Sequence, residues 1–154
     1  MFRINRETEY AIRMLLSLTK RGAGLRASTT EIQEEMVIPR SFAQRIIASL
    51  ARGSFVKTFP GRDGGVMLAR PARDINLLQL LVYFENYYFV SGCQNSDGEC
   101  PFQDECPICT QLERLRSVMS HELECVSLED LARNSKSENP IILNNYIQRI
   151  SVPM

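Results

Sequence analysis

The sequence predicts a mainly α-helical protein with one small β-hairpin, and three observations lead to this fold class. Two short segments of helical pattern follow one another across a tight connection at 37–39. Two strand-like segments then flank a turn rich in glycine and proline, and apolar residues later recur at helical spacing over 110–124. A helix pair followed by a hairpin is the pattern of a winged helix-turn-helix, here joined to a long additional helix.

The first helix is expected from Thr8 to Lys20, because its apolar residues recur at intervals of three and four and therefore share one face. Gly22 and Gly24 follow directly and are expected to end it. The residues expected to be buried on this face are Tyr10, Ala11, Met14, Leu15 and Leu18.

The next two helices are both expected to begin at a capping box, in which Ser precedes Glu or Gln by three residues. Ser28 and Glu31 open a helix that runs to about Met36, and Ser41 and Gln44 open one that runs to about Arg52. Two short capped helices with a tight turn between them indicate a helix-turn-helix. The apolar residues expected to face the core are Ile32 and Met36, then Phe42, Ile46, Ile47 and Leu50.

A small wing is expected directly after the helix pair. Residues 55–59 and 66–69 are rich in apolar and β-branched residues, and 60–65 read Pro-Gly-Arg-Asp-Gly-Gly. So many glycines and prolines in six residues indicate a turn, which places Arg62 at the tip of the wing.

A helix-turn-helix presents its second helix to the major groove of DNA, with the N-terminal residues toward the base edges. Gln and Arg are suited to paired hydrogen bonds with adenine and guanine. Lys57, in the first strand, is expected to contact a phosphate, and Arg62, beyond it, to reach the minor groove or the backbone. The candidate base contacts are Arg40, Ser41, Gln44 and Arg45.

The charge distribution favours a polyanionic partner for the first half of the chain. The 154 residues carry 18 Lys and Arg against 18 Asp and Glu, so the net charge is zero. Residues 1–73 nevertheless hold 13 basic and 6 acidic residues, whereas 74–154 hold 5 and 12. Charge separated in this way suggests that one half meets nucleic acid, although the halves could also simply neutralise each other.

Three regions are expected: a winged helix-turn-helix at 1–73, a linker helix with a cysteine loop and a dimerisation helix at 74–133, and a C-terminal tail at 134–154. The helices near 76–88 and 110–124 are too apolar for the surface of one chain. A second copy is the simplest cover, so 110–124 is expected to form a homodimer; the alternative is that it packs on its own winged helix.

Composition points to a soluble cytoplasmic protein. No apolar run reaches the roughly 18 residues that span a bilayer, and MFRINRETEY has no apolar core of a signal peptide. We therefore expect no membrane partner. In such a compartment five cysteines are expected to serve as thiols or metal ligands rather than as disulfides.

Four cysteines form a cluster with the pattern C-x6-C-x5-C-x2-C. The polar loop between them is acidic and has no basic residue, which is unfavourable for four free reactive thiols and favourable for a bound cation. Thiolates select zinc or iron–sulfur clusters. Only the last pair has the spacing of a zinc knuckle, so the spacing favours a cluster while leaving zinc open. The cluster cysteines are Cys93, Cys100, Cys106 and Cys109.

Cys125 stands apart from this cluster, beside Leu123 and Val126, and is expected to be a buried small hydrophobic residue. His121 is the only histidine and lies four residues earlier. A His–Cys ligand pair is possible at this spacing, but a histidine on the helix surface is the preferred interpretation.

Enzymatic function is not expected, because the chain has one histidine and no nucleophile motif, and its single C-x-x-C follows no βαβ pattern. No small-molecule substrate is expected either. Competing functions are a thiol-based redox sensor without metal, a zinc-stabilised regulator, and a winged-helix protein adaptor.

In combination, these features resemble the IscR/NsrR-type family of bacterial winged-helix iron–sulfur transcription regulators. The residues that carry the resemblance extend over roughly 1–133. They are TEYAIRMLL, STTEIQEEMVIPRSF, PGRDGGVMLARPARDINLLQLL, the cysteine loop and SLEDLAR.

The resemblance implies a homodimer that binds near-palindromic, double-stranded promoter DNA, often as a repressor, and holds a 2Fe–2S or 4Fe–4S cluster. Carried onto this chain, it implies that the three family ligands are Cys93, Cys100 and Cys106. The fourth ligand varies in the family, and here it would be Cys109 or, across the dimer, Glu9. The first cysteine gap is one residue longer than is usual in the family, and Val66 stands where the wing usually has an aromatic residue.

Overall fold

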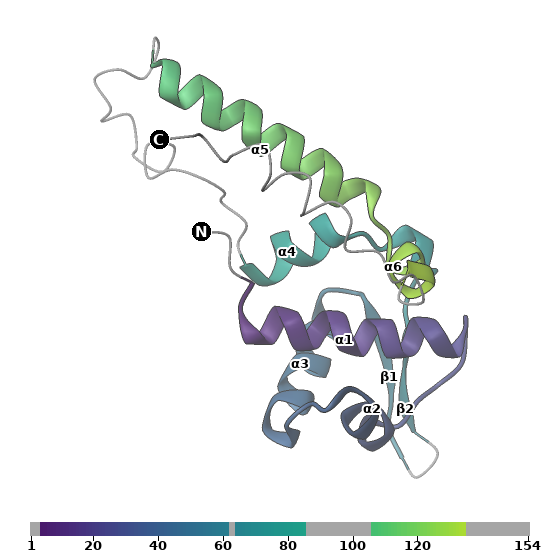
Figure 1. Ribbon diagram of the computed structural model, residues 1–154. Coiled ribbons are helices and arrows are strands. Elements are labelled where there is room, and N and C mark those ends of the chain that lie inside the picture. The colour runs from purple at the N-terminus through teal and green to yellow at the C-terminus, as the bar shows by residue number, and fades with distance from the viewer. Residues whose placement is uncertain (1–3, 62–63, 86–105, 135–154) are drawn as a thin grey trace, which may run out of the picture.

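The fold is the expected winged helix-turn-helix with a long helix projecting from it (Figure 1). A computed structural model describes residues 4–61, 64–85 and 106–134. The helices and strands are α1 (Arg6–Arg21), α2 (Thr29–Met36), α3 (Arg40–Arg52), β1 (Val56–Phe59), β2 (Gly65–Leu68), the 3-10 helix η1 (Ala72–Asp74), α4 (Leu77–Glu85), α5 (Pro107–Cys125) and α6 (Leu128–Asn134).

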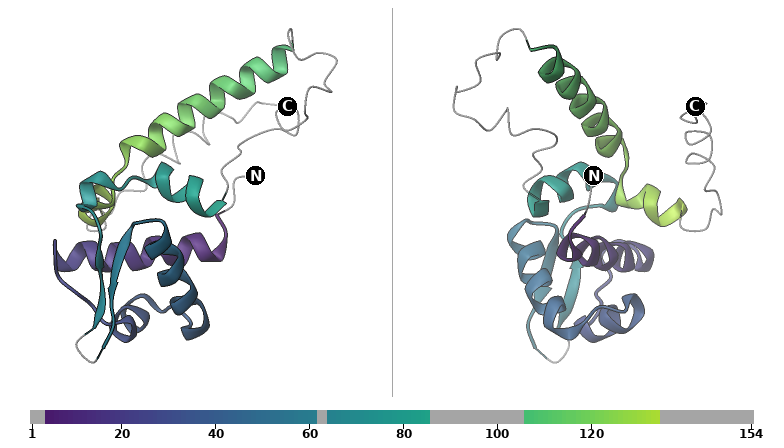
Figure 2. Two further views of the ribbon diagram at one scale, coloured as in Figure 1. Left: turned by 180° about the vertical axis from the view of Figure 1, so that it is seen from behind. Right: turned by 60° about the vertical axis from the view of Figure 1, so that its left-hand side comes forward.

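Helix α1 is the centre of the packing. It crosses the molecule between the helix-turn-helix and wing on one side and α4 and α6 on the other (Figures 1 and 2). The five residues expected to be buried on its apolar face are buried. The core on the helix-turn-helix side consists of Ile32, Ala43, Ile46, Ile47 and Leu50, and the opposite side adds Ile75, Leu80 and Leu128.

The start of α1 lies two residues earlier than expected, because Asn5 provides a cap that the periodicity does not reveal. The Asn5 side chain accepts a hydrogen bond from the Thr8 backbone N–H at 2.8 Å. This satisfies one of the free N–H groups in the first turn and allows the helix to begin at Arg6.

Of the two expected capping boxes, the first is confirmed and the second is wrong. The Ser28 hydroxyl accepts from the Glu31 N–H at 3.1 Å, and the Glu31 carboxylate accepts from the Ser28 N–H at 2.8 Å. Helix α3 instead begins at Arg40, with Pro39 as its N-cap and no side-chain cap. Proline has its φ already set for a helix start, so Ser41 falls inside the first turn.

The wing is an antiparallel hairpin in which Val56 pairs with Leu68 and Phe59 with Gly65. It joins the helix-turn-helix through Ala27, which exchanges two backbone hydrogen bonds of 2.8 and 2.9 Å with Val66. Gly65 has a φ of +153°, and a Cβ there would lie 2.8 Å from the Ala27 carbonyl oxygen. A glycine is therefore required where the wing approaches the helix pair.

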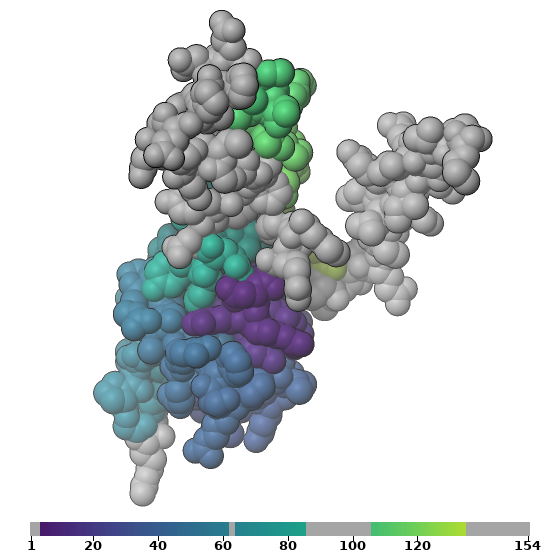
Figure 3. All heavy atoms as spheres, turned by 90° about the vertical axis from the view of Figure 1, so that its left-hand side faces the viewer, coloured from purple at the N-terminus to yellow at the C-terminus, as the bar shows by residue number. Residues whose placement is uncertain are grey.

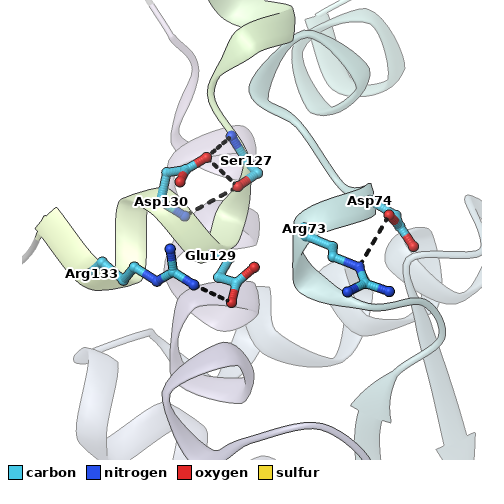
Figure 4. Close-up of polar contacts among 6 residues, drawn as sticks. All are labelled: Arg73, Asp74, Ser127, Glu129, Asp130 and Arg133. Carbon is cyan, nitrogen blue, oxygen red and sulfur yellow. Dashed lines mark hydrogen bonds and ion pairs between the residues drawn. The ribbon is translucent and has the colours of Figure 1, made fainter.

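Helix α5 is longer than the expected 110–124 because Pro107 occupies its first turn, a position that proline favours. Its C-terminal end is tied to the body by backbone bonds from Leu77 to Val126 and from Leu128 to Ile75. The short helix expected after Ser127 is present as α6. Ser127 and Asp130 cap it reciprocally (Figure 4), and this lowers the pKa of the Asp130 carboxyl through the Ser127 hydroxyl and backbone N–H.

Among the described residues, no helix combines the length and the apolar character needed to cross a membrane.

Glu35 connects α2 to α1 through two hydrogen bonds. Its carboxylate accepts hydrogen bonds from the buried Ser17 hydroxyl at 2.7 Å and from Arg21 at 2.9 Å. These two groups, the Ser17 hydroxyl first, hold the pKa of Glu35 below its ordinary value. A lowered pKa means that the ionised carboxylate stabilises the fold above the unfolded-state pKa of about 4.3. That stabilisation is lost as the pH falls through the lower folded-state pKa.

We predict that Glu35→Gln lowers the free energy of unfolding at neutral pH and that its difference from the wild type shrinks on acidification. The reason is that protonated Glu35 offers the same hydrogen bonding as glutamine. Urea unfolding at a series of pH values measures this difference. Glu34→Gln removes the same charge from the exposed neighbouring residue and is the control. The same pH dependence in both variants would contradict the prediction.

Candidate DNA-binding surface and cysteine segment

The N-terminal half of α3 presents one continuous polar face. The side chains of Ala43, Ile46 and Ile47 point into the core, which turns the positions between them outward. The wing lies on the same side of α1 as α3 (Figures 1 and 2), so both elements can face one ligand. The predicted base contacts Arg40, Ser41, Gln44 and Arg45 are all exposed on α3.

Arg45 is the member of this face with the most defined surroundings. Its guanidinium lies over the Phe42 ring, with its carbon 5.1 Å from the ring centroid. The Phe42 ring in turn packs edge-to-face on Tyr10 of α1 at 5.4 Å. One Arg45 nitrogen lies 3.4 Å from a carboxylate oxygen of Glu7, also on α1. Sequence reasoning missed Glu7, because it lies 38 positions before Arg45 and no local pattern links the two residues.

The wing contributes further cationic groups. Lys57 is exposed on β1, as expected for a phosphate contact, and Arg62 lies outside the described residues. Arg26, which sequence reasoning did not select, places its guanidinium over the Phe59 ring at 3.6 Å from the centroid. Arginine stacked on an aromatic face can present its hydrogen-bond donors at the edge, so Arg26 is a cationic group in addition to Lys57 among the described residues of this region.

The cysteine segment is described only at its end, since Cys93 and Cys100 lie outside the described residues. Cys106 is the N-cap of α5 and Cys109 lies in its first turn, and both are partly exposed. The pKa of the Cys106 thiol is lowered, first by the backbone N–H of Cys109, then by the Cys109 side chain and the Ile108 N–H. A lowered pKa favours the thiolate, which is the form that binds soft metals.

The donor set therefore fits a thiolate-ligated group, as far as it is described. Two thiols from a single helical turn supply half of a four-sulfur site. Within residues 4–61, 64–85 and 106–134, no three His, Cys, Asp or Glu side chains form a group that could hold a metal ion. Any complete site must therefore include residues beyond these ranges or residues of a second chain.

Besides Glu7, two carboxylates lie near the start of α1. Glu9, the alternative fourth ligand, is partly exposed and forms an ion pair with Arg13 in the same helix. Glu85 is the last residue of α4 and accepts hydrogen bonds from the Asn5 N–H at 2.8 Å and the Thr8 hydroxyl at 2.6 Å. Glu85 precedes the segment of the sequence that contains Cys93. These hydrogen bonds therefore join the last described residue before that segment to the winged helix.

The expectation for Cys125 is wrong, and that for His121 is confirmed. Cys125 is exposed, and its sulfur lies 3.9 Å from the His121 Nε2. Its apolar neighbours in sequence suggested burial, but α5 projects from the body and none of its residues is buried in the chain (Figure 1). His121 is exposed on the same helix.

A helix-turn-helix with an exposed polar recognition helix and a cationic wing defines a DNA-binding regulator of the winged-helix class. The comparisons agree with this assignment. Residues 4–134 match the Rrf2 family, described as an iron-dependent transcriptional regulator, so the chain belongs to that family. It is therefore a DNA-binding transcriptional regulator and not an enzyme.

One sequence relative and two solved structures show what the chain is similar to. The chain is 27% identical to the HTH-type transcriptional regulator NsrR of Oceanobacillus iheyensis over 134 residues, which cover 86% of this chain and 91% of the relative. CymR, called the global cysteine regulator of B. subtilis, has a similar structure, with a TM-score of 0.71, 21% identity, and coverage of 86% of this chain and 98% of CymR. IscR of T. potens gives a TM-score of 0.66 at 18% identity, covering 94% and 96% of the two chains.

Proposed function

We propose that this regulator binds operator DNA under the control of an iron–sulfur cluster, either 2Fe–2S or 4Fe–4S, held by Cys93, Cys100 and Cys106. Cys109 is the preferred fourth ligand, and Glu9 of a second copy is the alternative. The observation that carries the proposal is the pair of hydrogen-bonded thiols at the start of α5, where Cys106 is the N-cap and Cys109 lies in the first turn. The cluster would supply an oxidisable iron centre, and the chain supplies the thiolates and the helix that carries them.

A thiol-based or zinc-stabilised regulator is the second candidate function. It is favoured by the same lowered pKa of Cys106, because a thiolate near a second thiol also suits disulfide formation. The fold similarity to CymR, the global cysteine regulator of B. subtilis, is compatible with this candidate.

We predict that protein purified without oxygen is brown and contains equal amounts of iron and sulfide. The triple variant Cys93→Ala, Cys100→Ala, Cys106→Ala should lose both, whereas Cys125→Ala should keep them, because Cys125 lies outside the cluster pattern. Absorption spectra with iron, sulfide and zinc assays on the same sample measure this. Comparing Cys109→Ala with Glu9→Gln then identifies the fourth ligand.

Zinc at one ion per chain, without iron, would overturn the cluster proposal in favour of a structural site. Failure to take up iron and sulfide during anaerobic reconstitution would leave thiol sensing as the better account.

We further propose that α5 forms the interface of a homodimer. Ile108, Leu115 and Val118 are 67%, 47% and 53% exposed, respectively. Leu112 and Met119 complete an apolar face at intervals of three and four residues. Such a seam on a helix that projects from the body suits a matching helix of a second copy.

We predict that Leu115→Glu weakens the dimer by about 100-fold or more, since a buried carboxylate without a partner is costly. Ser117→Glu adds the same charge elsewhere on α5 and should leave the dimer intact. Sedimentation equilibrium over a range of concentrations, with circular dichroism as a check of folding, gives both results. A monomeric wild type would contradict the proposed interface.

For the DNA interface we propose that Arg40, Ser41, Gln44 and Arg45 enter the major groove, while Lys57 and Arg62 contact the backbone or minor groove. The support is the shared exposure of the four α3 residues beside a cationic wing.

We predict that Arg45→Ala weakens binding to the preferred operator by at least about fivefold and relaxes base preference at one position, as for loss of one base contact. Lys57→Ala should weaken binding to all sequences alike and reduce the slope of log affinity against log salt by about one. Arg114→Ala on α5 is the control. Binding to DNA selected from a random library measures these effects, and unchanged base preference in Arg45→Ala would refute its role.

A further inference from the structure

We propose that Glu7 is a positioning residue for DNA recognition, which holds the Arg45 guanidinium in place and thereby raises the preference for operator over other DNA. This inference rests on the proposed role of Arg45 in base recognition. It assigns a function to an acidic residue that belongs to neither the helix-turn-helix nor the wing.

Arg45 is held from two directions although its side chain is 60% exposed. The Phe42 ring supports the face of the guanidinium at 5.1 Å, and a Glu7 oxygen lies 3.4 Å from one of its nitrogens. A free arginine side chain on a helix surface samples many rotamers, and this freedom is lost when it binds. Contacts that restrict the Arg45 side chain before DNA binds reduce that entropic cost. The gain applies to the DNA sequence whose bases match the conformation in which Arg45 is held.

Glu7 is itself anchored by the fold. It lies in the first turn of α1, two residues after the N-cap Asn5 and directly before Thr8. Thr8 is buried, and its hydroxyl donates a hydrogen bond to Glu85 at 2.6 Å. The neighbouring contact of Tyr10 with Phe42 fixes α1 against α3 at this position. On the face shown in Figure 3, the start of α1 adjoins both α3 and α4. The Glu7 carboxylate is thus presented from a constrained helical turn and not from a mobile surface segment.

The same carboxylate lies next to a surface that is expected to meet phosphates. A negative charge there repels any DNA, whatever its sequence, and it offsets one cationic group available for phosphate neutralisation. Positioning favours the operator, and repulsion disfavours all DNA. Only the first effect raises the ratio of operator affinity to non-operator affinity, because the second lowers both affinities alike.

A merely structural ion pair at the surface predicts something different. Exposed pairs contribute little to stability, so loss of a merely structural pair leaves base preference unchanged, whereas removing any carboxylate beside DNA still steepens the salt dependence. The experiment must therefore separate the effect of the Glu7 charge from the effect of its contact with Arg45.

Three variants make this separation. Glu7→Gln removes the charge. Glu7→Asp keeps the charge but is shorter by one methylene, about 1.5 Å, so the carboxylate no longer reaches Arg45. Glu129→Gln is the matched control, because Glu129 also forms an ion pair with an arginine, Arg133 at 2.7 Å, but lies on α6 (Figure 4). All proteins are prepared anaerobically as full chains, and their iron content and thermal unfolding are compared with the wild type.

The probes are the operator fragment that the wild type selects from a random library and a scrambled fragment of equal length. For Glu7→Gln we expect the affinity ratio of the two fragments to fall by about fivefold or more, the lower bound for one base contact. Its affinity for the scrambled fragment should rise about two- to fivefold, and its salt slope should steepen by about 0.9. Glu7→Asp should lower the ratio while keeping the wild-type salt slope, and Glu129→Gln should match the wild type.

In the Arg45→Ala background, Glu7→Gln should no longer change the ratio, because the residue through which it acts is gone. A wild-type ratio in both Glu7→Gln and Glu7→Asp would overturn the inference while leaving the recognition surface intact. A wild type that selects no sequence from the library would overturn the proposed recognition surface and this inference with it.

Discussion

The whole structure depends on the burial of α1 on two sides. Its apolar face packs against α2 and α3, and the other side receives α4 and α6. Because Met14, Leu15 and Leu18 are almost completely buried, α1 cannot shift without disturbing either layer. The position of the recognition helix and the base of the projecting helix are therefore set by a single element.

This arrangement bears on the regulation proposed above. Cys106 and Cys109 lie at the start of α5, and the residues proposed to contact DNA lie beyond α1 on the other side of the molecule (Figures 1 and 2). Glu85 hydrogen bonds to the first turn of α1, and that turn also carries Glu7 beside Arg45. The end of α4 is thus connected to α3 through the first turn of α1, by groups that are in contact.

Local patterns predicted most of the fold. The Ser28–Glu31 capping box, the wing and the periodicity of α1 depend on neighbours within a few positions, and all are present. The second capping box failed because Ser41 and Gln44 match the motif while Pro39 already starts the helix. The predicted burial of Cys125 failed because its apolar neighbours in the sequence do not show that α5 projects from the rest of the protein.

The sequence by itself determined the class of fold, the polar face of α3 and the grouping of four thiols, since each is a matter of spacing along one segment. Only the tertiary structure decided which groups meet across segments. It brought Glu7 to Arg45, Glu35 to Ser17 and Glu85 to Thr8, pairs of residues far apart in the chain. Such pairs form because the burial of apolar faces dominates the packing of the helices and brings polar groups together at the edges of those faces. No local sequence pattern shows which polar groups will meet.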